Sequence, residues 1–264
     1  MVKQWENLDR THPSFPLPFR LYEGSAVTKS QPLVLYLRGT AFMEEERPEV
    51  ESAAARAIAD AGAKVVEADY CSVSGNVFPR ALECVFGAFM ALIAKRKRFG
   101  LARSQLLVAG DESGGNLAAS VALKARDHAA GELAGQILLS PMIDPRMATL
   151  SFRQADQIKM RVRWSDGWSH YLRSACGFEH PYAAPCLCSR LSGVAPALVV
   201  TSENDPLRDE ALGYGDRLAS AGVEVIRQVL PPESGWTGIY KGESGAWTSQ
   251  LCPEFSKFMR GLKT

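Results

Sequence analysis

The sequence lacks long apolar runs and any strong excess of one charge. No window offers the roughly 18 uninterrupted apolar residues that a membrane-spanning helix needs. A net charge of +1 argues against binding to nucleic acid or to a membrane surface, because both usually need a strong basic excess. The first 20 residues contain three prolines and no basic start followed by an apolar run, so no signal peptide is predicted. We expect a soluble, cytoplasmic protein.

The cysteines also lack the regular spacing of a disulfide framework. The six cysteines are scattered through the chain, which favours reduced thiols over disulfides. Cys176, His180, Cys186 and Cys188 lie near one another, but their spacing matches no common zinc pattern. No phosphate-binding glycine loop and no dinucleotide fingerprint appears. We therefore predict neither a metal nor a cofactor.

Short apolar segments alternate with helix-like segments, which indicates an α/β protein. The predicted strands are 33–37, 64–68, 105–109, 136–141, 197–202 and 223–230, and the predicted helices are 49–61, 79–95, 117–127, 210–221 and a last one toward 259. With 264 residues, 46% of them hydrophobic, the chain can bury one large core, so residues 1–264 are predicted to form a single domain. Periodicity is weak from 144 to 191, where aromatic residues are mixed with charges, and this segment is predicted to be a cap insertion.

The segment from Val108 to Ala118 organises the rest of the chain. An apolar run precedes a glycine-rich turn, and a helix-favouring segment follows it, which is the context of a nucleophile elbow. Such a turn holds one residue in a strained backbone conformation over the edge of the sheet. The residue at this apex determines the chemistry of the site.

This segment resembles the elbow of the hormone-sensitive-lipase-like α/β-hydrolases, which usually reads Gly-Asp-Ser-Ala-Gly-Gly-Asn-Leu-Ala. An ungapped match through Gly114-Gly115-Asn116 puts Glu112 in the place of the nucleophilic serine. Asp69-Tyr70 and the segment from Asp205 to Glu210 are similar to further family motifs, and the resemblance runs from Leu33 to the C-terminus. It implies a mainly parallel, doubly wound α/β-hydrolase sheet with a reduced cap.

The segment that resembles the family's oxyanion loop departs from the family pattern. Arg38-Gly39-Thr40-Ala41-Phe42 stands where the family has His-Gly-Gly-Gly-Phe, whose amides form most of the oxyanion hole. Side chains at Thr40 and Ala41 restrict the backbone and crowd an approaching ligand. An ordinary oxyanion hole is therefore not expected.

The resemblance implies a serine, an acid and a histidine in that order along the chain. Asp205 stands at the position of the acid, although it could equally cap the turn into the next helix. All four histidines precede Asp205, so none can follow Leu230, where the family has its histidine. We expect Trp236 to fill that gap. His170 in the cap could swing over the pocket as a substitute base, although a lone histidine in such a segment is usually a surface or packing residue.

Glu112 and Ser113 suggest different kinds of chemistry. A nucleophilic Ser113 requires the elbow to shift by one residue, and covalent attack by Glu112 leaves an ester that no histidine helps to hydrolyse. Proton transfer by Glu112 remains, because the helix dipole and an apolar pocket shift its pKa in opposite directions. We hypothesise that Arg38 forms a charge pair with Glu112 or grips a polar substrate with it; an inert salt bridge is the alternative.

Three functions are compatible with this site. The first hypothesis is a non-hydrolytic cyclase, lyase or isomerase with Glu112 as general acid-base and with Asp205 and Arg38 also catalytic. The second is a silent small-molecule-binding protein, as in the family's gibberellin-receptor relatives, and the third is an esterase with a rewired triad. The expected partner is a small molecule, and a homodimer stays open. The candidate substrate-binding residues are Gly39, Thr40, Ala41, Ser113, Trp236 and His170.

Overall fold

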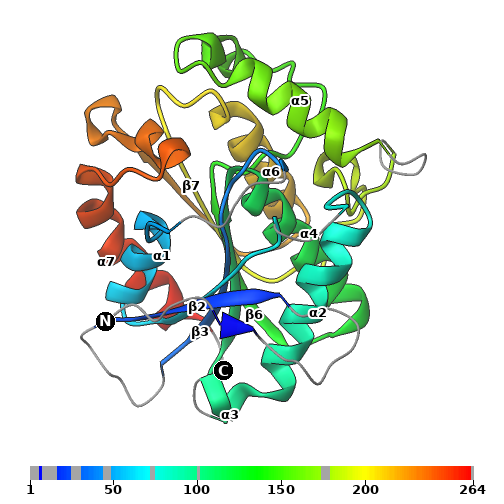
Figure 1. The fold of residues 1–264 in the computed structure, drawn as a ribbon, viewed down its shortest axis with the longest axis vertical. Coiled ribbons are helices and arrows are strands. Elements are labelled where there is room, and N and C mark those ends of the chain that lie inside the picture. The colour runs from blue at the N-terminus through cyan, green and yellow to red at the C-terminus, as the bar shows by residue number, and fades with distance from the viewer. Residues whose placement is uncertain are drawn as a thin grey trace.

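The computed structural model describes residues 6–7, 17–24, 31–43, 49–71, 75–99, 102–173 and 179–262. A sheet with the strand order β1-β2-β4-β3-β5-β6-β7-β8 runs through the middle of the molecule. The strand pairs from β4 to β8 are all parallel, and β2 pairs antiparallel with both β1 and β4. This is the α/β-hydrolase fold expected from the sequence (Figure 1).

The bounds of the elements are as follows. The strands are β1 Glu6–Asn7, β2 Pro18–Glu23, β3 Leu33–Leu37, β4 Lys64–Ala68, β5 Leu106–Asp111, β6 Leu133–Leu139, β7 Ala197–Ser202 and β8 Val225–Leu230. The α-helices are α1 Ala53–Asp60, α2 Arg80–Ala94, α3 Arg96–Phe99, α4 Glu112–His128, α5 Arg161–Tyr171, α6 Arg208–Ser220 and α7 Ala246–Gly261. The 3₁₀ helices are η1 Ser151–Asp156, η2 Pro185–Leu187, η3 Pro232–Ser234 and η4 Trp236–Lys241.

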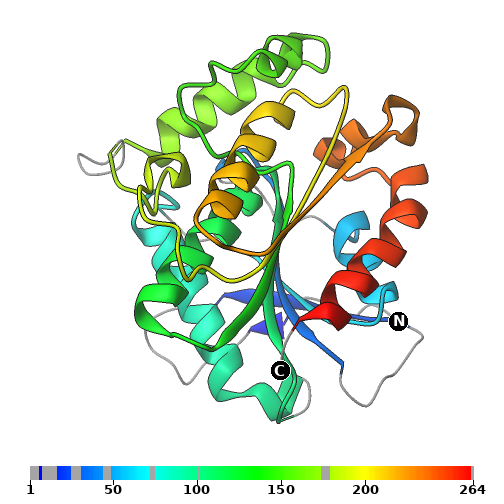
Figure 2. The same ribbon diagram turned by 180° about the vertical axis from the view of Figure 1, so that it is seen from behind.

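Helices cover both faces of the sheet. Leu33, Leu35 and Leu37 of β3 point to the core formed with α2, α4 and α6. Val34 and Tyr36 point to the opposite core, formed with α1 and α7. Figures 1 and 2 show α1 and α7 together on one side of the sheet and α2 and α4 on the other. Because both faces are buried, the strand reads as a continuous apolar run, which made it predictable.

Close backbone contacts hold the turn from β5 into α4 against the end of β3. A Cβ added to Gly114 would lie 2.0 Å from the carbonyl oxygen of Leu37, and one added to Gly110 would lie 2.3 Å from that of Gly114. Only glycine permits such approaches. The helix therefore begins at Glu112, five residues before the predicted start at Leu117, and the glycine-rich segment forms its first turn.

Residues 144–191, between β6 and β7, include one α-helix that the sequence did not predict. The buried residues of α5 are Trp164, Gly167, Trp168 and Tyr171, which follow the helical spacing i, i+3, i+4, i+7. Glycine is not counted as apolar, so this pattern was hidden in the sequence. In both views α5 lies beyond one end of the sheet (Figures 1 and 2).

None of the helices in the described part of the chain combines enough length with enough apolar character to cross a bilayer. Within the same residues, no three potential metal-binding side chains gather. Cys186 and Cys188 are free thiols, whereas Cys176, the third cysteine considered for a metal, lies outside the described residues.

Candidate active site

Glu112 stands at the apex of the turn between β5 and α4. Its φ of 51° lies in the left-handed region, which non-glycine residues rarely adopt. Strained residues of this kind cluster at functional sites, and the strand, turn and helix form the elbow that the sequence predicts. The apex side chain is nevertheless 2% exposed and therefore almost sealed from solvent.

The Glu112 carboxylate is held by donors from three directions. Its Oε2 accepts the N–H of Ala41 at 2.7 Å, and its Oε1 accepts the indole N–H of Trp164 at 2.5 Å. The backbone N–H of Ser113 adds a further hydrogen bond. Burial raises the pKa of Glu112, while these donors lower it by stabilising the anion. The net direction is upward, so burial outweighs the donors.

Ser113 has a hydroxyl that is already engaged on several sides. Its Oγ accepts the N–H of Thr40 at 2.9 Å and lies 3.2 Å from the hydroxyl of Tyr70. The same Oγ donates to Oε2 of Glu112 at 3.4 Å, a long contact. The side chain is fully buried. Ser113 thus joins the loop 38–42 to the start of α4.

The loop after β3 packs closely on this elbow. Ala41 and Phe42 both have left-handed φ values, 54° and 58°, which turn the Ala41 N–H toward Glu112. A Cβ on Gly39 would lie 2.6 Å from Cβ of Glu112. Helix α5 packs against the opposite side of this loop. The contact is so close that a Cβ on Gly167 would lie 1.8 Å from the carbonyl oxygen of Ala41. The predicted binding residues Gly39, Thr40, Ala41 and Ser113 are therefore brought together around Glu112, but they contact protein groups.

Asp205 lies after β7 in a second polar cluster. Its Oδ2 accepts the indole N–H of Trp236 at 2.5 Å and the hydroxyl of Ser140 at 2.6 Å. The hydroxyl of Tyr240 lies 2.7 Å from Oδ1, and the N–H of Leu207 donates to the same oxygen at 2.7 Å. Burial raises the pKa of Asp205, and these hydrogen bonds lower it. The hydrogen bond from the N–H of Leu207 is the contact that a cap of the turn makes, whereas the role of Asp205 as the acid of the site stays a prediction.

Aromatic rings connect the two clusters. Trp164, which donates to Glu112, meets the ring of Tyr240 edge-on at 5.2 Å between centroids, and Tyr240 donates to Asp205. The sequence analysis did not identify Tyr240, because no motif contains it. It lies four residues after Trp236, and both residues are on η4. Ser140 was missed as well, because the sequence marked it only as part of a strand.

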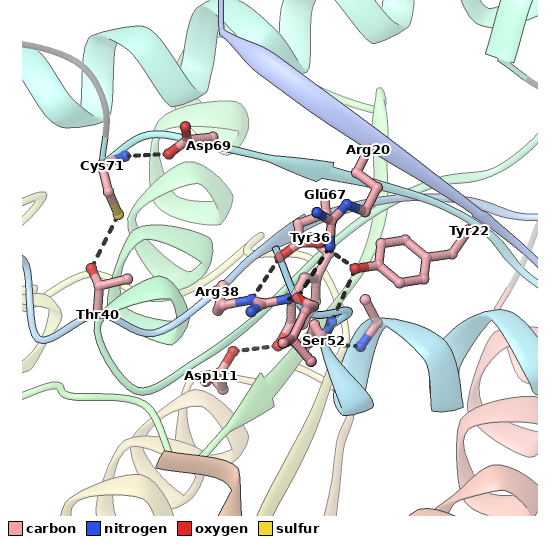
Figure 3. A network of polar contacts seen from close by, with 12 residues as sticks. Arg20, Tyr22, Tyr36, Arg38, Thr40, Ser52, Glu67, Asp69, Cys71 and Asp111 are labelled. Carbon is pink, nitrogen blue, oxygen red and sulfur yellow. Dashed lines mark hydrogen bonds and ion pairs between the residues drawn. The ribbon is translucent and has the colours of Figure 1, made fainter. Parts of the chain in front are cut away.

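The hypothesised charge pair between Arg38 and Glu112 is not formed. Arg38 Nε donates to Oε1 of Glu67 at 2.7 Å, and its Nη2 donates to the carbonyl oxygen of Val50. In Figure 3, Arg38 points into the network around Glu67 and Tyr22. The physical reason is that Glu67 lies on the neighbouring β4 within reach of Arg38 and is 1% exposed, so this buried carboxylate gains a cation in addition to the Tyr22 hydroxyl, whereas Glu112 is bound by amide and indole donors.

His170 does not reach either acidic residue. It lies on the last turn of α5, and its Nε2 has no hydrogen-bond partner among the described residues. The described contacts of Glu112 and Asp205 include no histidine. His170 of α5 is therefore no substitute base in this arrangement of the described residues.

The sheet order, the strained elbow and the buried acid after β7 define a protein of the α/β-hydrolase class. A family model described as alpha/beta hydrolase fold matches residues 34–233. The chain belongs to this family.

Two relatives from Mycobacterium tuberculosis are similar to the chain. Esterase LipI is 28% identical over 74% of this chain and 62% of its own length, and the carboxylic ester hydrolase LipN is 30% identical over 90% and 66%. The chain thus spans less than two thirds of the length of either. A solved thermostable esterase from Pseudomonas putida is 26% identical with a TM-score of 0.84, covering 100% of this chain and 84% of that one.

These names contradict the first functional hypothesis, a cyclase, lyase or isomerase. The relatives and the solved structure are named as esterases or ester hydrolases, and that finding replaces the hypothesis. The error arose because an acidic apex residue was interpreted as a new acid-base catalyst. In the structure the same carboxylate is tied to amide and indole donors of the protein itself.

The hydrogen bond from Trp236 to Asp205 gives a first prediction. We expect Trp236→Phe to lower the free energy of unfolding by about 1–3 kcal/mol, because it leaves a buried carboxylate with one donor fewer. Losing this donor raises the folded-state pKa of Asp205 further. A raised folded-state pKa favours stability at low pH, so in urea unfolding curves the deficit is expected to grow as the pH rises through the folded-state pKa of Asp205, which lies above that of a free aspartate.

Trp247→Phe is the matched control for this measurement. Trp247 is also fully buried, and its indole nitrogen has no hydrogen-bond partner among the described residues. It should show a loss of packing that does not change with pH. Equal pH profiles for the two variants would contradict the role given to the Trp236 donor.

Proposed function

We propose that this chain binds small molecules of the carboxylic-ester class without hydrolysing them through a serine, histidine and aspartate triad. The ester class follows from the relatives named above, and it is a proposal for this chain. In this proposal Glu112 takes the position of the nucleophilic serine, and Trp236 takes that of the histidine. The observation that carries it is the hydrogen bond from Ala41 to Glu112, at 2.7 Å.

Two physical arguments support the loss of triad chemistry. Indole nitrogen only donates a hydrogen bond, so Trp236 cannot accept a proton from a nucleophile as imidazole does. In addition, the amides of Ala41 and Ser113 are already bound to the Glu112 carboxylate. An oxyanion hole works by leaving such donors free for the charge that develops in the transition state.

A second candidate function is slow ester hydrolysis by a rewired site. The contact of 3.4 Å between the Ser113 hydroxyl and the Glu112 carboxylate favours it, because a nucleophile and a base must lie within reach of one another. The complete burial of Ser113 and its bond from Thr40 oppose it. We therefore rank it below ligand binding.

One experiment separates the two candidates. The protein is mixed with methyl butyrate and followed by ligand-detected NMR over a day. We expect saturation transfer from the protein to the ester, and an ester that stays intact at the rate of the buffer alone. Labelling with a fluorophosphonate, read by intact mass, is expected to leave the protein unmodified.

Ser113→Ala is the control for both measurements. If the wild type hydrolyses the ester or takes up the phosphonate, and Ser113→Ala does neither, the rewired esterase is correct and our proposal is wrong. An intact ester that shows no saturation transfer would also reject the proposal, because no binding would remain.

A further inference from the structure

A cavity of about 200 Å3 lies beside the sealed positions of Glu112 and Ser113. Its lining comes from β3 and the loop after it, from the first turn of α1, from α5 and from the segment around η4. Gly39 belongs to the lining, whereas Glu112 and Ser113 do not. The cavity is smaller than the roughly 300–1,000 Å3 of sites for drug-sized ligands, so it suits a molecule of few non-hydrogen atoms.

Two backbone amides at the start of α1 have no hydrogen-bond partner. Ala53 and Ala54 are the first two residues of this helix, so their N–H groups have no acceptor within it. The Ser52 cap accepts the next amide, that of Ala55, at 3.2 Å. Among the described residues no other acceptor binds the N–H of Ala53 or Ala54, and both residues line the cavity. Ala54 is 1% exposed, and a buried N–H without a partner costs free energy that a ligand oxygen would recover.

The charged groups of the lining are held by the protein itself or are exposed. Arg38 pairs with a buried glutamate of β4, and Asp111 accepts a tyrosine hydroxyl from β3 (Figure 3). Arg163 donates to a carbonyl oxygen of the loop at 3.4 Å. Lys241 and Glu243 have opposite charges and are exposed to water. A neutral ligand leaves these contacts intact.

Apolar and aromatic groups line the same cavity. Ile239 is a buried aliphatic side chain of the lining, and Tyr36 and Tyr240 contribute two rings. Both tyrosine hydroxyls already donate to acids, Asp111 and Asp205, so the rings are left to contact a ligand. A few polar groups beside an apolar wall are typical of small-molecule sites. An ester matches this lining, because it has one strong acceptor, its carbonyl oxygen, between two apolar ends.

We propose that this cavity binds a neutral short-chain carboxylic ester, whose carbonyl oxygen accepts hydrogen bonds from the amides of Ala53 and Ala54. The alkyl groups of the ester pack on Ile239 and on the ring of Tyr240. The inference rests on the proposed function and adds the place and the size class of the ligand. Because Ser113 does not line the cavity, its hydroxyl does not meet the ester there.

Methyl butyrate and butyl methyl ether are the probes, because they have the same chain and differ by the carbonyl oxygen. The full chain is labelled with nitrogen-15, and its backbone amide signals are followed by NMR during titration with each probe. Methyl butyrate is expected to shift the amide proton signals of Ala53 and Ala54 downfield, whereas the ether is not. We expect the ether to bind about three- to tenfold more weakly, the range for one lost hydrogen bond.

Ala53→Pro removes one of the two donors. Proline is favoured at the first position of a helix, and Ser52 before it has φ −74° and ψ 122°, an extended conformation that a residue before proline readily adopts. We expect the variant to fold, as checked by circular dichroism, and to bind methyl butyrate about three- to tenfold more weakly while the ether changes much less. Ala246→Pro is the matched control. Ala246 is the exposed first residue of α7 and does not line the cavity, so both affinities should stay as in the wild type.

The outcomes separate this inference from the proposed function. Bound methyl butyrate that leaves the signals of Ala53 and Ala54 in place overturns the amide site. So does an Ala53→Pro variant that binds both probes as the wild type does, or that loses affinity for both equally. If the ester still binds and stays intact in these cases, the proposed function stands without the site. Hydrolysis of methyl butyrate rejects the proposed function, and an absence of saturation transfer rejects both.

Discussion

Replacing Glu112 with serine and Trp236 with histidine together is expected to create ester hydrolysis in this protein. Serine at the apex supplies a nucleophile and frees the N–H of Ala41. Histidine at 236 supplies a base whose other nitrogen can donate to Asp205, as the indole now does. The smaller side chains also open room for an acetyl group. We expect p-nitrophenyl acetate turnover about 10²- to 10⁴-fold above either single variant, the usual contribution of a positioned base.

The single variants are the controls for this result. Glu112→Ser has a nucleophile without a base, and Trp236→His has a base without a nucleophile, so neither should exceed the buffer rate. Asp205→Asn added to the double variant should reduce the new activity, because Asp205 orients the histidine. A double variant that folds and is no faster than its parents would show that Glu112 and Trp236 do not occupy the serine and histidine positions.

Gly167→Ala is expected to have the second large effect, a loss of about 2–4 kcal/mol in the free energy of unfolding. The new Cβ would lie 1.8 Å from the carbonyl oxygen of Ala41, so α5 and the loop must separate. This separation also breaks the hydrogen bond from Trp164 of α5 to Glu112, which helps to keep the Glu112 carboxylate buried. Urea unfolding followed by circular dichroism measures the change.

Gly213→Ala in α6 is the matched substitution. No atom lies within 4 Å of a Cβ at this position, so replacing glycine in a helix should stabilise the protein by about 0.5–1 kcal/mol. If Gly167→Ala is stabilising as well, α5 does not pack on the loop in solution. The difference between the two variants thus isolates the contact from the general effect of removing a helical glycine.

Much of the fold was predictable because buried parallel strands carry a local signal. β3, β4 and β7 have the predicted bounds, since each is a short segment with an apolar centre that ends at turn residues. β2 was not predicted, because its Pro18–Glu23 sequence mixes charges with apolar residues and lies at the antiparallel side of the sheet. α5 was hidden because a glycine occupies part of its buried face.

Some of the residues around Glu112 were predictable from the sequence, and the pairing of the side chains was not. The elbow motif placed Glu112 beside Ser113 and the loop residues, and the structure brings these together. Partner choice depends on which groups lie within reach of one another, which requires coordinates: Arg38 binds Glu67, although Glu67 also accepts the Tyr22 hydroxyl. Trp164 and Tyr240 are separated from the acids by more than 30 residues, so no local pattern could connect them.

The carboxylate of Glu112 has a consequence for inhibitors. In the proposed assignment it sits on the amides that an oxyanion would use, and it would then act as a covalently tethered competitor for that place. A tethered group competes at an effective concentration that a dissolved molecule rarely matches. Transition-state mimics of ester cleavage, such as boronic acids, should therefore gain affinity chiefly by shortening residue 112, since no improvement of the inhibitor removes an occupant that cannot diffuse away.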